Sequence, residues 1–133
     1  MAGSSRPELT YRIHVEAGRE AREDETVAVG LTNPDEIIRI RRLPVLTERY
    51  ITRIMTLAQG AVLFEFNQTG KHALEVATST EIGKTLVVLL NGRLIYAAEI
   101  DMPLRSGRIL IPGEIAPEEV QYIQKYIEKR QKL

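Results

Sequence analysis

One stretch of the sequence decides the fold: KTLVVLLNGRLIYAAEI, residues 84–100. Its first part, residues 85–90, carries no charge, and an unbroken run of apolar and β-branched residues predicts a strand buried on both faces. The pair Asn91-Gly92 then predicts a type I′ turn, because both central residues of that turn need a positive φ, which asparagine tolerates and glycine adopts freely. The stretch therefore predicts a β-hairpin at the centre of the core, and it indicates no chemistry of its own.

The segments on either side of this hairpin predict one helix before it and one after it. Asn67 is placed to cap the first helix, and Gly83 is placed to end it. The predicted buried stripe of this helix is Ala73, Leu74, Val76 and Ala77, and its predicted outer face is Lys71, Glu75, Thr78 and Glu81. Pro117 begins the second helix, whose predicted buried face is Val120, Ile123, Tyr126 and Ile127.

The remaining predicted elements are short strands joined by turns. We expect strands at residues 9–15, 26–31, 36–43, 51–57, 61–66 and 108–111, and apolar and polar residues alternate clearly in 9–15 and 36–43. Residues 47–50 could cap a short helix, but we expect a brief turn there, followed by the strand 51–57. We expect residues 16–25 to form a solvated, mobile charged loop, and residues 32–35 to form a turn. Residues 1–8 read as a disordered start or a remnant of cloning, and residues 9–133 as a single domain. The predicted fold class is α+β and ferredoxin-like, a mostly antiparallel sheet of hairpins with two helices packed on one face.

The composition excludes several classes of function. Eighteen basic and eighteen acidic side chains cancel, so no long-range field favours nucleic acid or an anionic membrane surface. The chain has no cysteine, which excludes disulfides, thiolate metal sites and cysteine nucleophiles. No run approaches the roughly 20 apolar residues of a membrane span, and the first residues do not form a signal peptide.

Several short motifs occur in an order that is typical of one family. They are Phe64-Glu65-Phe66-Asn67-Gln68-Thr69-Gly70-Lys71, Ile82-Gly83-Lys84, Leu86-Val87-Val88-Leu89-Leu90-Asn91-Gly92-Arg93, Ala97-Ala98-Glu99-Ile100, Met102-Pro103-Leu104, Gly107 to Ile111 and Ala116-Pro117-Glu118-Glu119-Val120. In this order and spacing they resemble the head of the first periplasmic domain of the SecD and SecDF protein-export family. The segment Arg42-Leu43-Pro44-Val45-Leu46-Thr47 extends the resemblance to roughly residues 9–130. Ala98 stands where the family usually has proline, and Met102 where glutamate is common.

The resemblance implies a non-enzymatic binding domain outside the cytoplasm, in the periplasm or cell envelope, that contacts emerging polypeptide or a membrane partner in protein translocation. Addition of an extended peptide to a sheet edge is a physical means of such binding, and residues 51–66 and 93–111 are the edges we would test. The resemblance implies no cofactor, and the sequence indicates neither a binding surface nor an oligomeric state. The alternative is a small ligand-binding or enzymatic α+β domain of unknown substrate with the same fold.

Two groups of side chains are candidates for catalytic or metal-binding roles. His14 and His72 lack a third ligand at a recognisable spacing, so we expect both on the surface rather than in a zinc site. Glu65, Glu99 and Asp101 could supply a carboxylate pair for acid–base work, but no nucleophile accompanies them. We therefore predict neither catalytic nor metal-binding residues.

Three further groups have simpler structural explanations. Arg39, Arg41 and Arg42 suggest a phosphate or carboxylate site, but a solvated or salt-bridged strand face explains them better. The isolated glycines Gly70 and Gly83 fit helix ends rather than a phosphate loop. Tyr122 and Tyr126, one turn apart on the last predicted helix, complete a core edge more often than they form an interaction surface.

Overall fold

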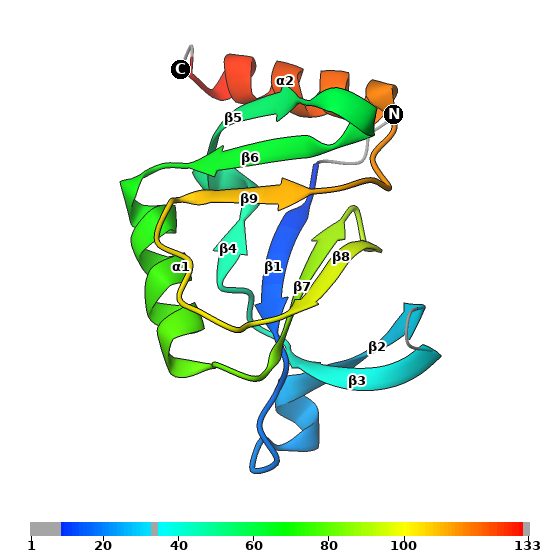
Figure 1. The fold of residues 1–133 in the computed structure, drawn as a ribbon, viewed down its shortest axis with the longest axis vertical. Coiled ribbons are helices and arrows are strands. Elements are labelled where there is room, and N and C mark those ends of the chain that lie inside the picture. Colours follow the sequence, from blue (N-terminus) through cyan, green and yellow to red (C-terminus); the bar gives the residue numbers. More distant parts are fainter. Residues whose placement is uncertain (1–8, 33–34, 132–133) are drawn as a thin grey trace, which may run out of the picture.

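The predicted hairpin is present in the computed structural model, which describes residues 9–32 and 35–131 (Figure 1). Strand β7 (Thr85–Leu90) pairs antiparallel with β8 (Arg93–Glu99). Between them, Asn91 and Gly92 have φ values of 50° and 82°, as a type I′ turn requires. The turn prediction is confirmed, and four of the six side chains of β7 are buried.

The described strands form three antiparallel sheets rather than one. The first has the order β4-β1-β7-β8 and the second the order β5-β6-β9, while β2 and β3 form a separate hairpin that we call the arm. The bounds not yet given are β1 (Tyr11–Val15), β2 (Thr26–Thr32), β3 (Asp35–Arg41), β4 (Leu46–Thr47), β5 (Ile51–Thr56), β6 (Val62–Phe66) and β9 (Arg108–Ile111). Short 3-10 turns occur at Glu23–Glu25, Glu48–Tyr50 and Ala58–Gly60.

The sheets are separate because the chain turns a corner between β4 and β5. The 3-10 turn Glu48–Tyr50 connects these two strands, and β4 stays with the first sheet while β5 begins the second. The α+β class, the antiparallel pairing and the two helices are confirmed, whereas the ferredoxin-like arrangement stays a prediction. The expected disordered start at residues 1–8, and two residues of the expected turn at 32–35, lie outside the described residues.

The two larger sheets pack against each other through aromatic side chains. The ring of Tyr11 on β1 stacks on Phe64 of β6, with centroids 4.6 Å apart and planes 29° apart. Both side chains are fully buried within a cluster that includes Leu74 of the first helix and Ile123 of the second. Burial raises the pKa of Tyr11 well above its ordinary value, and its buried hydroxyl has no hydrogen-bond partner among the described residues.

Helix α1 (Gln68–Thr80) begins where the sequence predicts, since the side chain of Asn67 accepts a hydrogen bond of 2.9 Å from the amide of Gly70. A Cβ atom at Gly70 would lie only 2.9 Å from side-chain atoms of Leu46 and Tyr50. Glycine at this position therefore lets the helix approach the corner between the sheets, a role beyond that of a helix start.

The predicted faces of α1 are wrong at two positions. Val76 is 50% exposed, and Thr78 is 0% exposed. Thr78 can be buried because its hydroxyl donates to the carbonyl of Leu74 (2.8 Å) and accepts from the amide of Leu104 (2.8 Å). The hydroxyl thus fastens the loop between β8 and β9 to the helix, and a polar residue occupies the core face.

Helix α2 (Pro117–Gln131) lies across β5 at the top of Figure 1. Its predicted face is confirmed, because Val120, Ile123 and Ile127 are buried and Tyr126 packs half-buried against the core. No helix in the described part of the chain is long and apolar enough to cross a membrane.

Candidate binding site along strand β8

Strand β8 is an open sheet edge. It pairs with β7 on one side, and β9 likewise pairs only with β6, so β8 and β9 end their sheets. No backbone hydrogen bond recorded among the described residues joins β8 to β9. An edge of this kind presents unpaired N–H and C=O groups to a further strand.

The other end of the second sheet is closed. Arg130 of α2 donates hydrogen bonds to the carbonyls of Glu48, at 2.9 Å, and Ile51, and Gln131 donates to the carbonyl of Thr52 at 3.4 Å. Side chains of the last helix therefore occupy backbone acceptors at the β5 edge. The sequence segment 51–66 consequently offers no comparable opening, since β6 is flanked by β5 and β9.

The regular part of the open edge is Tyr96–Glu99. Ile95 has no partner in the register between β7 and β8, and this bulge interrupts the strand before Tyr96. The amide of Ile100 donates to the carbonyl of Lys84 at 2.8 Å, so the backbone groups of Ile100 face β7. In an antiparallel strand, the backbone N–H and C=O groups of successive residues face opposite sides. The alternation places the amides of Ala97 and Glu99 on the open side.

The pairing of β7 supports this assignment independently. Thr85, which lies opposite Glu99, makes its backbone bonds to Glu16 on the other side, as donor at 2.9 Å and acceptor at 2.8 Å. Thr85 therefore points its backbone groups away from Glu99, and the groups of Glu99 are left for the open edge.

Two pockets adjoin β8 and share Tyr96, Ala98 and Glu99; together we call them the β8 groove. The first, about 390 Å³, lies between β8 and β9 and has a mainly apolar wall that includes Ile100, Met102, Leu104, Ile109, Leu110 and Pro112. The second, about 690 Å³, lies between β8 and the arm, and all seven residues of β8 line it. An extended chain along Tyr96–Glu99 would therefore have a wall on each side.

The cations of the β8 groove are bound by carboxylates of the chain itself. Arg93 donates two hydrogen bonds to the carboxylate of Glu119, at 3.0 and 2.9 Å. This pairing raises the pKa of Arg93 and lowers that of Glu119, chiefly through the hydrogen bonds between them. Arg108 forms an ion pair of 3.4 Å with Glu65.

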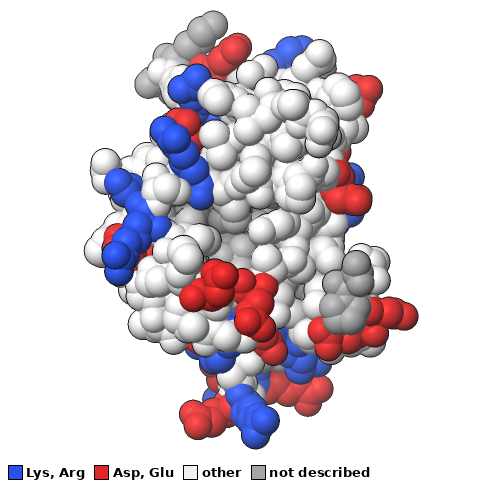
Figure 2. Space-filling view, in the orientation of Figure 1, with Lys and Arg blue, Asp and Glu red and all other residues white. Residues whose placement is uncertain are grey.

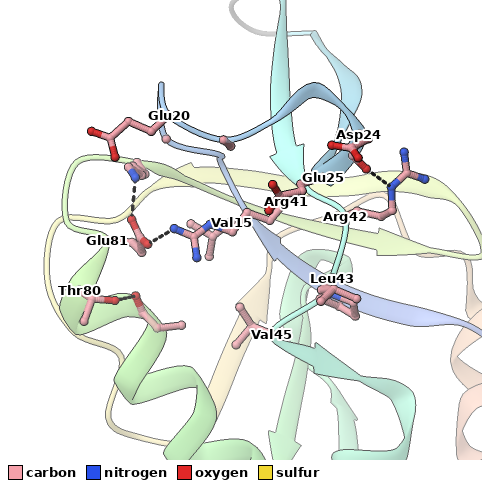
Figure 3. A pocket seen from close by; sticks show the side chains of 15 residues that line it. Val15, Glu20, Asp24, Glu25, Arg41, Arg42, Leu43, Val45, Thr80 and Glu81 are labelled. Atoms are coloured by element: carbon pink, nitrogen blue, oxygen red, sulfur yellow. Dashed lines mark hydrogen bonds and ion pairs between the residues drawn. The ribbon is translucent and has the colours of Figure 1, made fainter.

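A charged pocket of about 820 Å³ lies elsewhere, between the loop 16–25, the end of β3 and the end of α1 (Figure 3). Glu81 lines this pocket, and its carboxylate contacts Arg41 at 2.6 Å and Lys84 at 2.8 Å. Figure 3 shows Arg42 turned instead toward the backbone of Asp24. Because these charges are used in joining the arm to α1, we interpret the pocket as a structural joint rather than a ligand site.

The three arginines singled out from the sequence are all engaged by the chain. Arg41 pairs with Glu81, Arg39 donates to the hydroxyl of Thr26 at 2.6 Å, and Arg42 donates to backbone carbonyls. The structure thus does not bring them together as an anion site.

The expected surface position of His14 is wrong. The residue is buried, and its Nδ1 lies 2.7 Å from the carbonyl of Arg41, to which it donates. Burial lowers the pKa of His14, and the positive charge of Arg12 acts in the same direction, while the bond to Arg41 opposes them. The end of β3 covers β1 at this point, which the alternation of β1 could not reveal. His72 is exposed as expected.

The carboxylates considered for acid–base work are not brought together as a set. Glu99 and Asp101 line the first pocket of the β8 groove, but Glu65 is paired with Arg108. Within residues 9–32 and 35–131, no group of three His, Asp or Glu side chains could hold a metal ion. Tyr126 lies beside Arg130, 5.3 Å from ring centroid to guanidinium carbon, and Tyr122 is 37% exposed.

Sequence reasoning missed the arm as a wall of the site. The pocket beside β8 is lined on its other side by Gly30, Leu31 and Glu36 of the arm. This placement depends on β2 and β3 forming a sheet of their own, and the sequence of these two segments does not indicate which strand they lie beside. The segment 93–111 was a candidate edge, and the structure places the open strands β8 and β9 there.

Comparison with known proteins gives consistent results. A family model for the "SecDF, P1 head subdomain" matches residues 25–129. A curated "Protein translocase subunit SecD" from Rickettsia bellii is 31% identical over 61 residues, which are 46% of this chain and 12% of that protein.

Two solved structures have a similar fold. "Structure and function of a membrane component SecDF that enhances protein export" gives a TM-score of 0.61 at 21% identity, covering 86% of this chain and 60% of the other. "Crystal structure of SecDF in Super-membrane-facing form" gives 0.60 at 22% identity, covering 86% of this chain and 18% of the other. The chain therefore spans less than two thirds of each of these relatives.

Proposed function

The chain belongs to the SecDF P1 head subdomain family, and from this premise we propose that it binds an extended polypeptide segment along the open edge of β8. Family membership gives the chain a role in protein translocation. The finer proposal is a non-enzymatic binding domain that acts outside the cytoplasmic membrane on polypeptide in transit.

The observation that carries this proposal is that unpaired backbone amides on the edge of β8 lie next to apolar side chains. Ala97 and Glu99 present backbone groups to the open side, and exposed apolar side chains such as Leu110 and Met102 line the neighbouring pocket. Main-chain hydrogen bonds give affinity that does not depend on sequence, and an apolar wall favours unfolded segments with exposed apolar side chains. Both properties suit a partner that varies from one exported protein to the next.

A titration of amide NMR signals tests the proposal. The probe is an uncharged peptide of alternating valine and threonine with blocked ends, added to near-millimolar concentration. We expect the amides of Tyr96–Glu99 and of β9 to shift together, and the amides of β5 to stay in place. Shifts confined to other elements, or no shift at all, would contradict the proposal.

A pair of variants at one position supplies the control. Ala97→Pro removes the outward amide without touching the β7 ladder, and proline is tolerated at such edge positions. Ala97→Val keeps the amide and suits a strand. We expect Ala97→Pro to lose the peptide-induced shifts and Ala97→Val to retain them; equal binding by the two variants would exclude pairing at this edge.

A further inference from the structure

The charges around the β8 groove are unbalanced, although those of the whole chain cancel. Arg93 and Arg108 are occupied by Glu119 and Glu65. Four carboxylates on the groove walls form no ion pair with any other described residue, namely those of Glu36, Glu99, Asp101 and Glu114. The groove therefore carries uncompensated negative charge at its walls.

The four carboxylates come from different parts of the fold. Glu99 ends β8 and lines both pockets, and Asp101 begins the loop that leads toward β9. Glu36 lies on β3 of the arm, and Glu114 lies between β9 and α2. All four residues are exposed. Figure 2 shows acidic side chains gathered along the lower border of a largely uncharged face, on the side toward the arm.

From this charge distribution we propose that the β8 groove selects extended segments in which lysine or arginine flanks a short apolar stretch. The inference rests on the proposed function and adds a substrate class to it. The apolar side chains of the segment contact the exposed side chains of Leu110 and Met102, and its basic side chains reach Glu99 and Asp101 at the end of the open edge. Long aliphatic stems suit this placement, since lysine and arginine can pack their methylenes on apolar surface while the charge stays in water.

The physical consequence is a preference that depends on salt. A single exposed ion pair contributes little to affinity, but an acidic segment is also repelled by the same carboxylates. The ratio of the affinities of a basic and an acidic segment therefore reflects attraction and repulsion together and exceeds the effect of either alone. The Debye length falls from roughly 10 Å at 0.1 M salt to about 3 Å at 1 M, so salt should remove the preference while leaving apolar contacts in place.

The test compares three peptides with the same valine–threonine centre and blocked ends: one flanked by lysine, one by glutamate and one uncharged. Binding to the full chain is measured by fluorescence anisotropy and by amide shifts. We expect the lysine peptide to bind about tenfold more tightly than the glutamate peptide at low salt, and the ratio to fall below about threefold near 1 M salt.

Matched variants assign the preference to the groove. Glu99→Gln with Asp101→Gln should bring the ratio close to one while the uncharged peptide binds as before. Glu20→Gln with Glu128→Gln changes the net charge equally on exposed residues outside the groove and should preserve the ratio.

The outcomes separate the inference from the function on which it rests. Binding of the uncharged peptide at β8 with no charge preference, or a preference that survives Glu99→Gln with Asp101→Gln, overturns the inference and leaves the proposed function standing. Absence of binding by all three peptides overturns both. Dimerisation of the chain through β8, seen as concentration-dependent shifts of its edge amides without peptide, would assign the groove to a second copy and overturn both as well.

Discussion

Two of the edge strands, β5 and β8, have different surroundings. At β5, Arg130 and Gln131 of α2 donate to carbonyls of Ile51 and Thr52, so side chains of the chain take the place of a neighbouring strand. At β8, the bulge at Ile95 interrupts the edge, and Tyr96–Glu99 remains regular, with no partner strand on its outer side.

The difference teaches that the open edge is a local feature rather than a general property of this small fold. Exposed regular edges promote aggregation, and proteins usually cover, shorten or charge them. Here one edge is covered by a helix, and the other is flanked by carboxylates and by the arm. Charged walls that discourage self-association would at the same time admit a strand of complementary charge.

The largest expected effect comes from a change in the core between the two sheets to which β5 and β8 belong. Phe64→Ala removes the ring that stacks on Tyr11 and leaves a cavity between the two sheets. We expect the free energy of unfolding to fall by about 3 to 5 kcal/mol, the usual range for a buried phenylalanine. Urea denaturation followed by circular dichroism measures it, and a loss below about 1 kcal/mol would show that the sheets do not depend on this contact.

Neighbouring prolines on β8 test the outward direction of its amides. Ala98→Pro removes an amide that pairs with β7 and should cost about 3 kcal/mol of stability, whereas Ala97→Pro should cost under about 1 kcal/mol. Thermal denaturation of the two variants side by side measures the difference. The opposite ranking would mean that the alternation is shifted by one residue and that Tyr96 and Ala98 face the open side.

Removing the side chain of Arg130, which covers the edge of β5, should reduce stability less than Phe64→Ala does. Arg130→Ala removes the guanidinium that binds the carbonyls of Glu48 and Ile51, which should lower the free energy of unfolding by about 1 to 3 kcal/mol. In the peptide titration we expect new shifts at β5. Arg130→Lys serves as control, since it keeps a donor but not the two-pronged geometry, and should lose less stability. Unchanged stability in both variants would exclude a role for Arg130 in closing this edge.

The smallest expected effect concerns the arm that walls the open edge. Burial lowers the pKa of His14, whose Nδ1 donates to the carbonyl of Arg41 where β3 ends. Because its folded pKa lies below the ordinary 6.5, the unfolded chain binds the proton more readily, and stability should fall as pH drops below about 6.5 and level off below the folded pKa. Denaturation between about pH 8 and pH 5 measures this loss, and His14→Asn should reduce it. An equal loss in that variant would assign it to other groups.

Much of the fold could be predicted because its signals are local. The Asn91-Gly92 turn, the Asn67 cap and the start of α2 at Pro117 each depend on a few neighbouring residues. The burial of a side chain by a distant segment cannot be predicted in this way. The burial of His14 depends on β3, and that of Thr78 on an amide supplied by Leu104, so neither can be inferred from the periodicity of its own element.

The candidate site was predictable only as a segment. Residues 93–111 were singled out as a possible edge, but an edge is defined by the absence of a neighbour, which only the sheet order reveals. Nor could sequence distinguish β8 from β5, because the closure of β5 depends on Arg130 at the far end of the chain. The charge imbalance in the β8 groove likewise becomes visible only when the occupied arginines are known.

The place of β1 in the first sheet has a consequence for the kinetics of folding. In the register of β1 with β7, Tyr11 lies opposite Leu90 and Val15 opposite Leu86, so the partner of β1 lies about 70 residues later in the sequence. Strands β7 and β8, by contrast, are joined by a two-residue turn. Such distant pairings are slow to form because a long loop must close first. During synthesis or threading through a pore from the N-terminus, β1 would emerge early and stay without its β7 partner until Thr85–Leu90 had followed.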